Sequence, residues 1–163
     1  DYVTAWEVAG PYTLDDGNLN ELFETAFAPE SEPADEEIEW GLVPVGTHAG
    51  MPYLVELDKA LGGQNRVAYL RTNIWSDATR QALLEIGSDD GNKVWLNGEP
   101  AHEINAVRPV KPGQDVAEIT LQAGWNPLLV KVTQGDGEWS FCLRVRARDG
   151  GPIEGVRASV RVE

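Results

Sequence analysis

The chain has 163 residues, of which 27 are Asp or Glu and 13 are Lys or Arg, so its formal net charge is −14. A chain of this length can bury a hydrophobic core as one domain without disulfides or metals. The negative charge argues against nucleic-acid phosphates and anionic lipid surfaces as partners, and the apolar runs are too short to cross a bilayer.

The N-terminal part predicts two strands, one short helix and one loop. Trp6 in VTAWEVAGPY and Trp40 in EEIEWGLVPV lie on the apolar sides of period-two patterns, which predicts that both are core residues. Between them, LNELFETAF (19–27) could form a short helix. The following APESEPADEE (28–37) is typical of an acidic, proline-containing loop.

From residue 66 onward the hydrophobic period is two, as in β-strands. Runs such as RVAYLRTNIW (66–75) and RQALLEIGS (80–88) carry an apolar face and a more polar face. The last run, GVRASVRVE (155–163), would end the chain as a strand. The predicted core-facing residues are Ala68, Leu70, Thr72, Ile74, Ala82, Leu84, Ile86, Val94, Leu96, Ala117, Ile119, Leu121, Leu128, Val130, Val132, Trp139, Phe141, Leu143, Val145 and Ala147.

Turn signals separate these strands. LNGEP, KPGQD, AGWNP, QGDGE and RDGGP punctuate the chain at roughly the 8 to 12 residue spacing of β-sandwiches. The sequence therefore predicts an all-β fold, namely a single antiparallel β-sandwich.

One turn, GSDDGNKVWLNG (87–98), carries two adjacent carboxylates, Asp89 and Asp90. Alternation on both sides predicts a hairpin, in which Gly91 supplies the positive φ of a tight turn. Two functions of the pair stay open at this point. Asp side chains cap turns by bonding their own backbone, whereas convergent carboxylates bind calcium, which takes 6 to 8 oxygen ligands.

Catalytic motifs are missing from the sequence. Only His48 and His102 could act as imidazole bases, and no nucleophile elbow, H-E-x-x-H helix or cysteine cluster occurs. A small hydrolase would need clustered acids with raised pKa values in a cleft, and no motif supplies them. We therefore expect a domain that is not an enzyme.

SDDGNKVWLNG (88–98) resembles the signature hairpin of PA14-type lectin and adhesin domains, in which Asp-Asp-Gly precedes an apolar-aromatic-apolar strand. In sugar-binding members an Asp pair joined by a cis peptide holds a calcium ion, which in turn holds sugar hydroxyls. Carried over, the resemblance makes Asp89 and Asp90 the calcium ligands. The further acidic or Asn loop ligands of the calcium lectins find no match in this chain.

The rest of the chain is similar to the galactose-binding-like jelly rolls that are appended to bacterial glycoside hydrolases and other secreted modular proteins. The matching segments are WEVAGPY (6–12), YLRTNIWS (69–76) and LQAGWNPLLVKVTQGDGEWSFCLRV (121–145). The resemblance implies a galactose-binding-like jelly-roll β-sandwich over residues 1–163. It also implies a bacterial protein that is secreted or displayed on the cell surface. Because the chain begins at Asp1 without Met or a signal segment, we expect a mature product, an engineered chain or, as the resemblance implies, a module excised from a larger protein.

Four residues complete the predicted ligand site. Trp75 and Trp125 have the best chance among the tryptophans of being exposed for stacking on sugar rings, although covering a core edge is an equal alternative. Asn105 and Arg108 are the best hydrogen-bonding groups of the long polar connection after the Asp turn, where Arg108 could instead pair with an acid.

These observations predict a non-catalytic carbohydrate-binding module that binds a polysaccharide or oligosaccharide. It would concentrate a tethered catalytic domain of the parent protein on its substrate, with Ca²⁺ as the cofactor that the resemblance implies. The alternative is a structural or protein-interaction β-sandwich without a glycan ligand.

Overall fold

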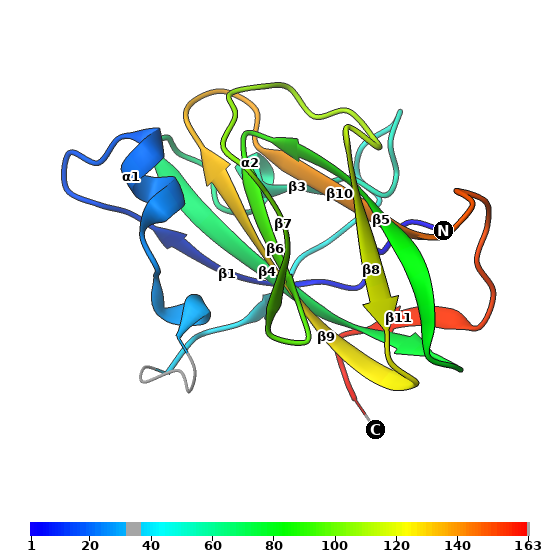
Figure 1. Ribbon diagram of the computed structural model, residues 1–163. Coiled ribbons are helices and arrows are strands. Elements are labelled where there is room, and N and C mark those ends of the chain that lie inside the picture. Colours follow the sequence, from blue (N-terminus) through cyan, green and yellow to red (C-terminus); the bar gives the residue numbers. More distant parts are fainter. Residues whose placement is uncertain (32–36, 163) are drawn as a thin grey trace.

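The structure is a computed structural model that describes residues 1–31 and 37–162. Its strands form two antiparallel sheets that face each other (Figure 1). The β-sandwich predicted from the period-two pattern is thus confirmed, while the jelly-roll assignment within that class stays a prediction.

The larger sheet has the strand order β2-β1-β4-β9-β6-β7, and β11 also pairs with β4. Its strands are β1 (Glu7–Tyr12), β2 (Gly41–Leu42), β4 (Arg66–Ser76), β6 (Asn92–Leu96), β7 (Glu99–Ile104), β9 (Gly124–Gln134) and β11 (Val156–Ser159).

The smaller sheet has the order β3-β10-β5-β8. Its strands are β3 (Val55–Glu56), β5 (Arg80–Asp89), β8 (Asp115–Leu121) and β10 (Ser140–Ala147). Three short helices occur among the described residues: α1 (Leu19–Glu24), the 3-10 helix η1 (Ala28–Glu30) and α2 (Leu57–Ala60). None of the helices in the described ranges has the length and apolarity that crossing a membrane requires.

The main core lies between the two sheets. Nearly every residue predicted to face it is buried there, because alternate side chains of both sheets point inward. Trp6 and Trp139 are both fully buried, as the apolar patterns predict. Ala147, at the end of β10, is half-buried.

A second, smaller core covers the outer face of the larger sheet. Helix α1 lies against β4 and β9 and buries Leu22 with Val67 and Tyr69, two residues that alternation places on the less apolar face of β4. Asn18 caps α1, since its side chain accepts a hydrogen bond from the Glu21 N–H at 3.0 Å. This cover explains why one half of β4 is buried on both sides.

Two sequence predictions in the peripheral segments are wrong. Trp40 is not a core residue but lies half-buried on the outer face, with the guanidinium carbon of Arg71 4.2 Å from its ring centroid. Its neighbour Leu42 is 73% exposed because β2 is a two-residue edge strand. The last strand stops at Ser159 rather than running to the chain end.

In the predicted acidic loop, residues 28–30 form η1, and residues 32–36 lie outside the described ranges. The predicted helix within 19–27 is confirmed as α1.

The hairpin predicted around the Asp pair is also wrong. Strand β5 pairs with β10 and β8 in the smaller sheet, whereas β6 pairs with β7 and β9 in the larger one. The Asp pair therefore lies where the chain crosses from one sheet to the other. A turn signal locates the end of a strand but does not say whether the flanking strands pair.

Candidate functional site

Asp90 lies where the chain crosses between the sheets, and backbone groups of three distant residues form hydrogen bonds with it. The bond between Asp89 and Asp90 is a cis peptide. The Asp90 N–H donates to the Thr133 carbonyl at 2.9 Å. Its carboxylate accepts from two further N–H groups, with Oδ1 3.0 Å from the Arg108 nitrogen and Oδ2 2.8 Å from the Gly135 nitrogen. Asp90 is thereby fixed with both carboxylate oxygens directed at neighbouring loops.

Asp89 is the electrostatically unusual member of the pair. It is 7% exposed, and its burial, its hydrogen bond to Asp90 and the negative charges of Asp90, Glu138 and Asp58 raise its pKa to about 7. Neither member of the pair forms a salt bridge within the described part of the chain. The site therefore concentrates negative charge that a proton or a cation would neutralise.

Gly91 has a different role from the one expected. It does not adopt a positive φ. Instead, a Cβ added there would lie 2.5 Å from the Ile104 carbonyl oxygen and 3.2 Å from Thr133 Oγ1. The Gly91 N–H also donates to that hydroxyl at 3.0 Å. Close approach of neighbouring backbone, not turn geometry, is what requires glycine here.

We expect Gly91→Ala to lower the free energy of unfolding by about 2 kcal/mol, because the backbone of residue 104 cannot move away freely. Urea unfolding of both proteins measures the difference. Gly41→Ala is the matched control, since a Cβ at Gly41 meets nothing within 4 Å and should change stability by less than about 0.5 kcal/mol. Equal stability of Gly91→Ala and the wild type would contradict the steric explanation.

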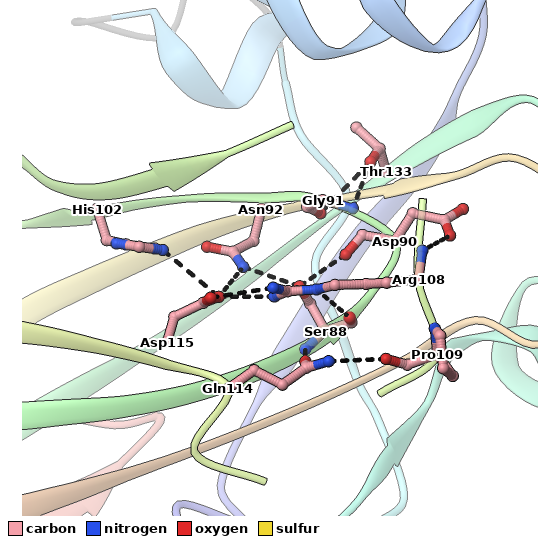
Figure 2. Close-up of polar contacts among 10 residues, drawn as sticks. All are labelled: Ser88, Asp90, Gly91, Asn92, His102, Arg108, Pro109, Gln114, Asp115 and Thr133. Atoms are coloured by element: carbon pink, nitrogen blue, oxygen red, sulfur yellow. Dashed lines mark hydrogen bonds and ion pairs between the residues drawn. The ribbon is translucent and has the colours of Figure 1, made fainter. Parts of the chain in front are cut away.

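A charged network lies directly beside Asp90 (Figure 2). The guanidinium of Arg108 forms a bidentate pair with Asp115, with nitrogen–oxygen distances of 2.6 and 3.0 Å. The same guanidinium donates to the Ser88 carbonyl at 3.1 Å and to the Ser88 hydroxyl at 3.0 Å. Ser88 in turn donates to the Asp90 carbonyl at 2.7 Å. The network thus stabilises residues 88–90, where the chain crosses between the sheets; we call this segment the Asp crossing.

Asp115 is the acceptor at the centre of this network. Asn92 Nδ2 donates to it at 3.2 Å, and Nε2 of His102 lies 3.4 Å from its Oδ2. Burial acts to raise the pKa of Asp115, but the hydrogen bond and charge of Arg108, followed by Asn92 and His102, hold it below the ordinary value. Asp115 is therefore ionised in the folded protein at neutral pH.

The four-residue sequence Asp-Asp-Gly-Asn occurs twice in the chain, at 89–92 and at 15–18. At 15–18 both aspartates are exposed and Asn18 caps a helix. At 89–92 both aspartates are buried between two sheets. The local sequence is the same, so the surroundings alone make Asp89 and Asp90 a candidate cation site.

The structure divides the predicted ligand-binding residues into two groups. Arg108 and Asn105 lie near the Asp pair, but the guanidinium of Arg108 is engaged by Asp115 and Ser88, and Asn105 Nδ2 donates to Asn20 Oδ1 at 2.8 Å. Arg108 thus takes the alternative role expected from the sequence, that of pairing with an acid.

Trp75 and Trp125 lie together at the other end of the larger sheet. They are cross-strand partners with ring centroids 5.4 Å apart, and both are half-buried under Arg157. Trp125 and Thr133 are eight residues apart on β9, which corresponds to about 26 Å at 3.3 Å per residue. The structure therefore does not bring these tryptophans to the Asp pair.

Sequence reasoning missed Asp115 and Thr133, which define the surroundings of the Asp pair. Asp115 begins β8 after the turn KPGQD and looks like ordinary turn chemistry. Thr133 lies near the end of a strand whose partner the sequence does not reveal. The one signal available in the sequence is a polar residue within an apolar run, such as Lys131 or Thr133, because such a residue needs a polar partner when it is buried.

No protein-family model matches the sequence, and no curated protein matches it significantly. Among solved structures, the PA14 domain of the MpAFP antifreeze protein matches with a TM-score of 0.45 and 14% identity, over 60% of this chain and 54% of that chain. The PA14 sugar-binding domain from an RTX adhesin matches with a TM-score of 0.43 and 17% identity, over the same shares.

A β-glucuronidase from Faecalibacterium prausnitzii matches with a TM-score of 0.50 and 18% identity, over 81% of this chain and 20% of that chain. The chain thus spans about half the length of the two PA14 structures and one fifth of the glucuronidase. The match to the glucuronidase, at 18% identity and a TM-score of 0.50, is a likeness of fold alone.

Proposed function

We propose that this β-sandwich is a non-catalytic carbohydrate-binding module whose Asp89–Asp90 crossing binds calcium and presents it to sugar hydroxyls. The observation that carries the proposal is the convergence of two buried carboxylates, without a salt-bridge partner among residues 1–31 and 37–162, at the junction of the two sheets.

The donor set fits calcium in kind. Both side chains offer only oxygen, and each Asp90 carboxylate oxygen accepts one backbone N–H bond, which leaves it a second lone pair. Within the described ranges no three His, Cys, Asp or Glu side chains form a metal-binding group. Backbone carbonyls, water and sugar hydroxyls would therefore complete the 6 to 8 ligands. Such a dependence on outside ligands suits a site whose task is to bind sugar.

The larger role follows from attachment. Weak glycan binding by this domain would raise the local concentration of polysaccharide for a glycoside-active enzyme or another domain of a secreted or cell-surface bacterial protein. The competing function, a structural or protein-interaction domain without a glycan ligand, is the outcome of a negative binding test.

Calcium is expected to raise the midpoint of thermal unfolding. A ligand that binds only the folded state at 100 times its Kd adds about 2.7 kcal/mol, which corresponds to roughly 5–10 °C for a domain of this size. The measurement is a thermal melt in chelator and then in excess calcium, repeated with a panel of neutral and acidic polysaccharides.

Asp89→Asn should abolish the calcium increment because it removes a charged oxygen ligand. Asp15→Asn is the matched control, since it changes the first aspartate of the other, exposed Asp-Asp-Gly-Asn sequence and should leave the increment intact. If neither calcium nor any glycan moves the wild-type midpoint, the Asp pair serves the architecture and the interaction-domain function is favoured.

A further inference from the structure

A cavity of about 790 Å³ lies on the outer face of the larger sheet, away from the core between the sheets. We call it the sheet-face groove and define it by Glu7, Trp40, Arg71, Asn73, Trp95 and Leu129, all of which line it. Its volume is within the range of sites that take small-molecule ligands.

The floor of the groove is one row of side chains that crosses four strands. Glu7 of β1 pairs in register with Arg71 of β4, and Arg71 pairs with Leu129 of β9. Leu129 also pairs with Trp95 of β6. Because cross-strand partners point to the same face, the row offers a carboxylate, a guanidinium, an apolar side chain and an indole in sequence.

Trp40 supplies a second aromatic group. It is half-buried, as is Trp95, and Arg71 stacks on its ring. Asn73, on the same strand face as Arg71, adds an amide. Indole rings that pack on apolar ring faces, together with nearby polar groups that bond hydroxyls, are the combination that an oligosaccharide requires.

The charges of the groove are balanced. Arg71 Nε lies 3.3 Å from Glu7 Oε1, and the other lining acid, Glu30, pairs with Lys131 at 2.9 Å. Among the lining residues that the structure describes, Arg71 is the only cation, so none of them is left over for an anionic sugar. In a chain of net charge −14, this balance favours a neutral ligand.

The groove is separate from the Asp crossing. Leu129 and Thr133 lie four residues apart on β9, about 13 Å along the strand. Between them Lys131 is fully buried beneath the segment that carries α1, where its ammonium donates to the carbonyls of Phe23 and Thr25. A ligand in the groove therefore does not share the surroundings of Asp89 and Asp90.

We propose that the sheet-face groove binds a neutral oligosaccharide without calcium, as a second site beside the Asp crossing. The inference rests on the proposed function, since it takes the domain to be a carbohydrate-binding module, and it adds where and which class of sugar is bound. Stacking on Trp95 and Trp40 and hydrogen bonds to the Arg71–Glu7 pair supply the affinity.

The test is a calorimetric titration of the intact chain in chelator with cellohexaose, xylohexaose, mannohexaose and hexagalacturonate. At least one neutral hexasaccharide should bind, and hexagalacturonate should not. Trp95→Ala and Arg71→Gln should each weaken that binding about tenfold, as truncation of central aromatic and Arg contacts typically does.

Arg71→Gln keeps the test valid if Trp95→Ala does not fold, because the Arg71 side chain is 46% exposed. Arg80→Gln is its matched control, since Arg80 forms a similar exposed pair with Asp77 outside the groove. Both Arg80→Gln and Asp89→Asn should keep the wild-type Kd within twofold.

If no neutral hexasaccharide binds in chelator, the proposal that the sheet-face groove binds sugar is wrong. The proposal is also wrong if both Trp95→Ala and Arg71→Gln bind with the wild-type Kd. If glycans bind only with calcium and only when Asp89 is intact, the proposed function stands and the groove inference fails. Binding in chelator that depends on Trp95, combined with no effect of calcium, supports the groove and removes the calcium site.

Discussion

Arg108→Ala is expected to lower the free energy of unfolding by about 3–4 kcal/mol at pH 7. The guanidinium is 17% exposed and its partner Asp115 is 7% exposed, so the substitution leaves a buried carboxylate without its cation. It also removes the donors that reach the carbonyl and the hydroxyl of Ser88. Urea unfolding with a fixed m-value gives the difference directly.

The pH dependence of this effect has a definite sign. Because the pKa of Asp115 is lowered in the folded state, its stabilisation is complete above the ordinary carboxyl pKa and is lost as the pH falls through the folded value. The difference in free energy of unfolding between wild type and Arg108→Ala should therefore become smaller in acid, below about pH 4.

Arg80→Ala provides the comparison for Arg108→Ala. Arg80 lies 2.6 Å from Asp77, whose side chain is 62% exposed, so solvent screens the pair and its loss should cost less than about 1 kcal/mol. Losses of equal size in the two variants would contradict the assignment of Arg108 as a buried brace of the Asp crossing.

Lys131→Ala is expected to cost about 3 kcal/mol and to loosen the segment that carries α1. The ammonium donates to the Phe23 carbonyl at 2.8 Å and to the Thr25 carbonyl at 2.6 Å, and it pairs with Glu30 at 2.9 Å. Burial lowers the pKa of Lys131, and Glu30 opposes that shift. Removing the ammonium leaves three acceptors without their cation.

Two measurements separate this effect from a general loss of stability. Urea unfolding gives the global change, and hydrogen exchange of the Leu22 and Thr25 amides, which are bonded within α1, should accelerate. Lys59→Ala is the control, because the Lys59 side chain is 63% exposed and pairs with Glu56, outside the segment that carries α1. Unchanged exchange of α1 in Lys131→Ala would show that other contacts hold the segment.

The binding proposals change in one respect once the fold is known. From the sequence, Trp75, Trp125, Asn105 and Arg108 form one wider site around the Asp pair. In the structure the two tryptophans lie at the far end of the larger sheet, and Arg108 is bound to Asp115. A calcium-dependent site and a calcium-independent groove are therefore two hypotheses that independent variants can test.

The period of two predicts the β-sandwich and most of the core between its sheets, but not the second core on the outer face. Alternate side chains of a strand point to opposite faces, so the face that carries apolar residues can be recognised from the local sequence as the one that is buried. The same pattern was wrong for Trp40, because an indole on an edge segment can cover the outside of a sheet as well as its core side.

Strand pairing and the surroundings of each polar group could be read only from the folded chain. The sequence Asp-Asp-Gly-Asn is an exposed helix entry at 15–18 and a buried crossing between sheets at 89–92. The difference comes from Thr133, Gly135 and Arg108, which lie far along the chain and donate or accept the bonds that hold Asp90. Long-range partners set the burial of a carboxylate and the hydrogen bonds that it accepts, and a local pattern carries no information about them.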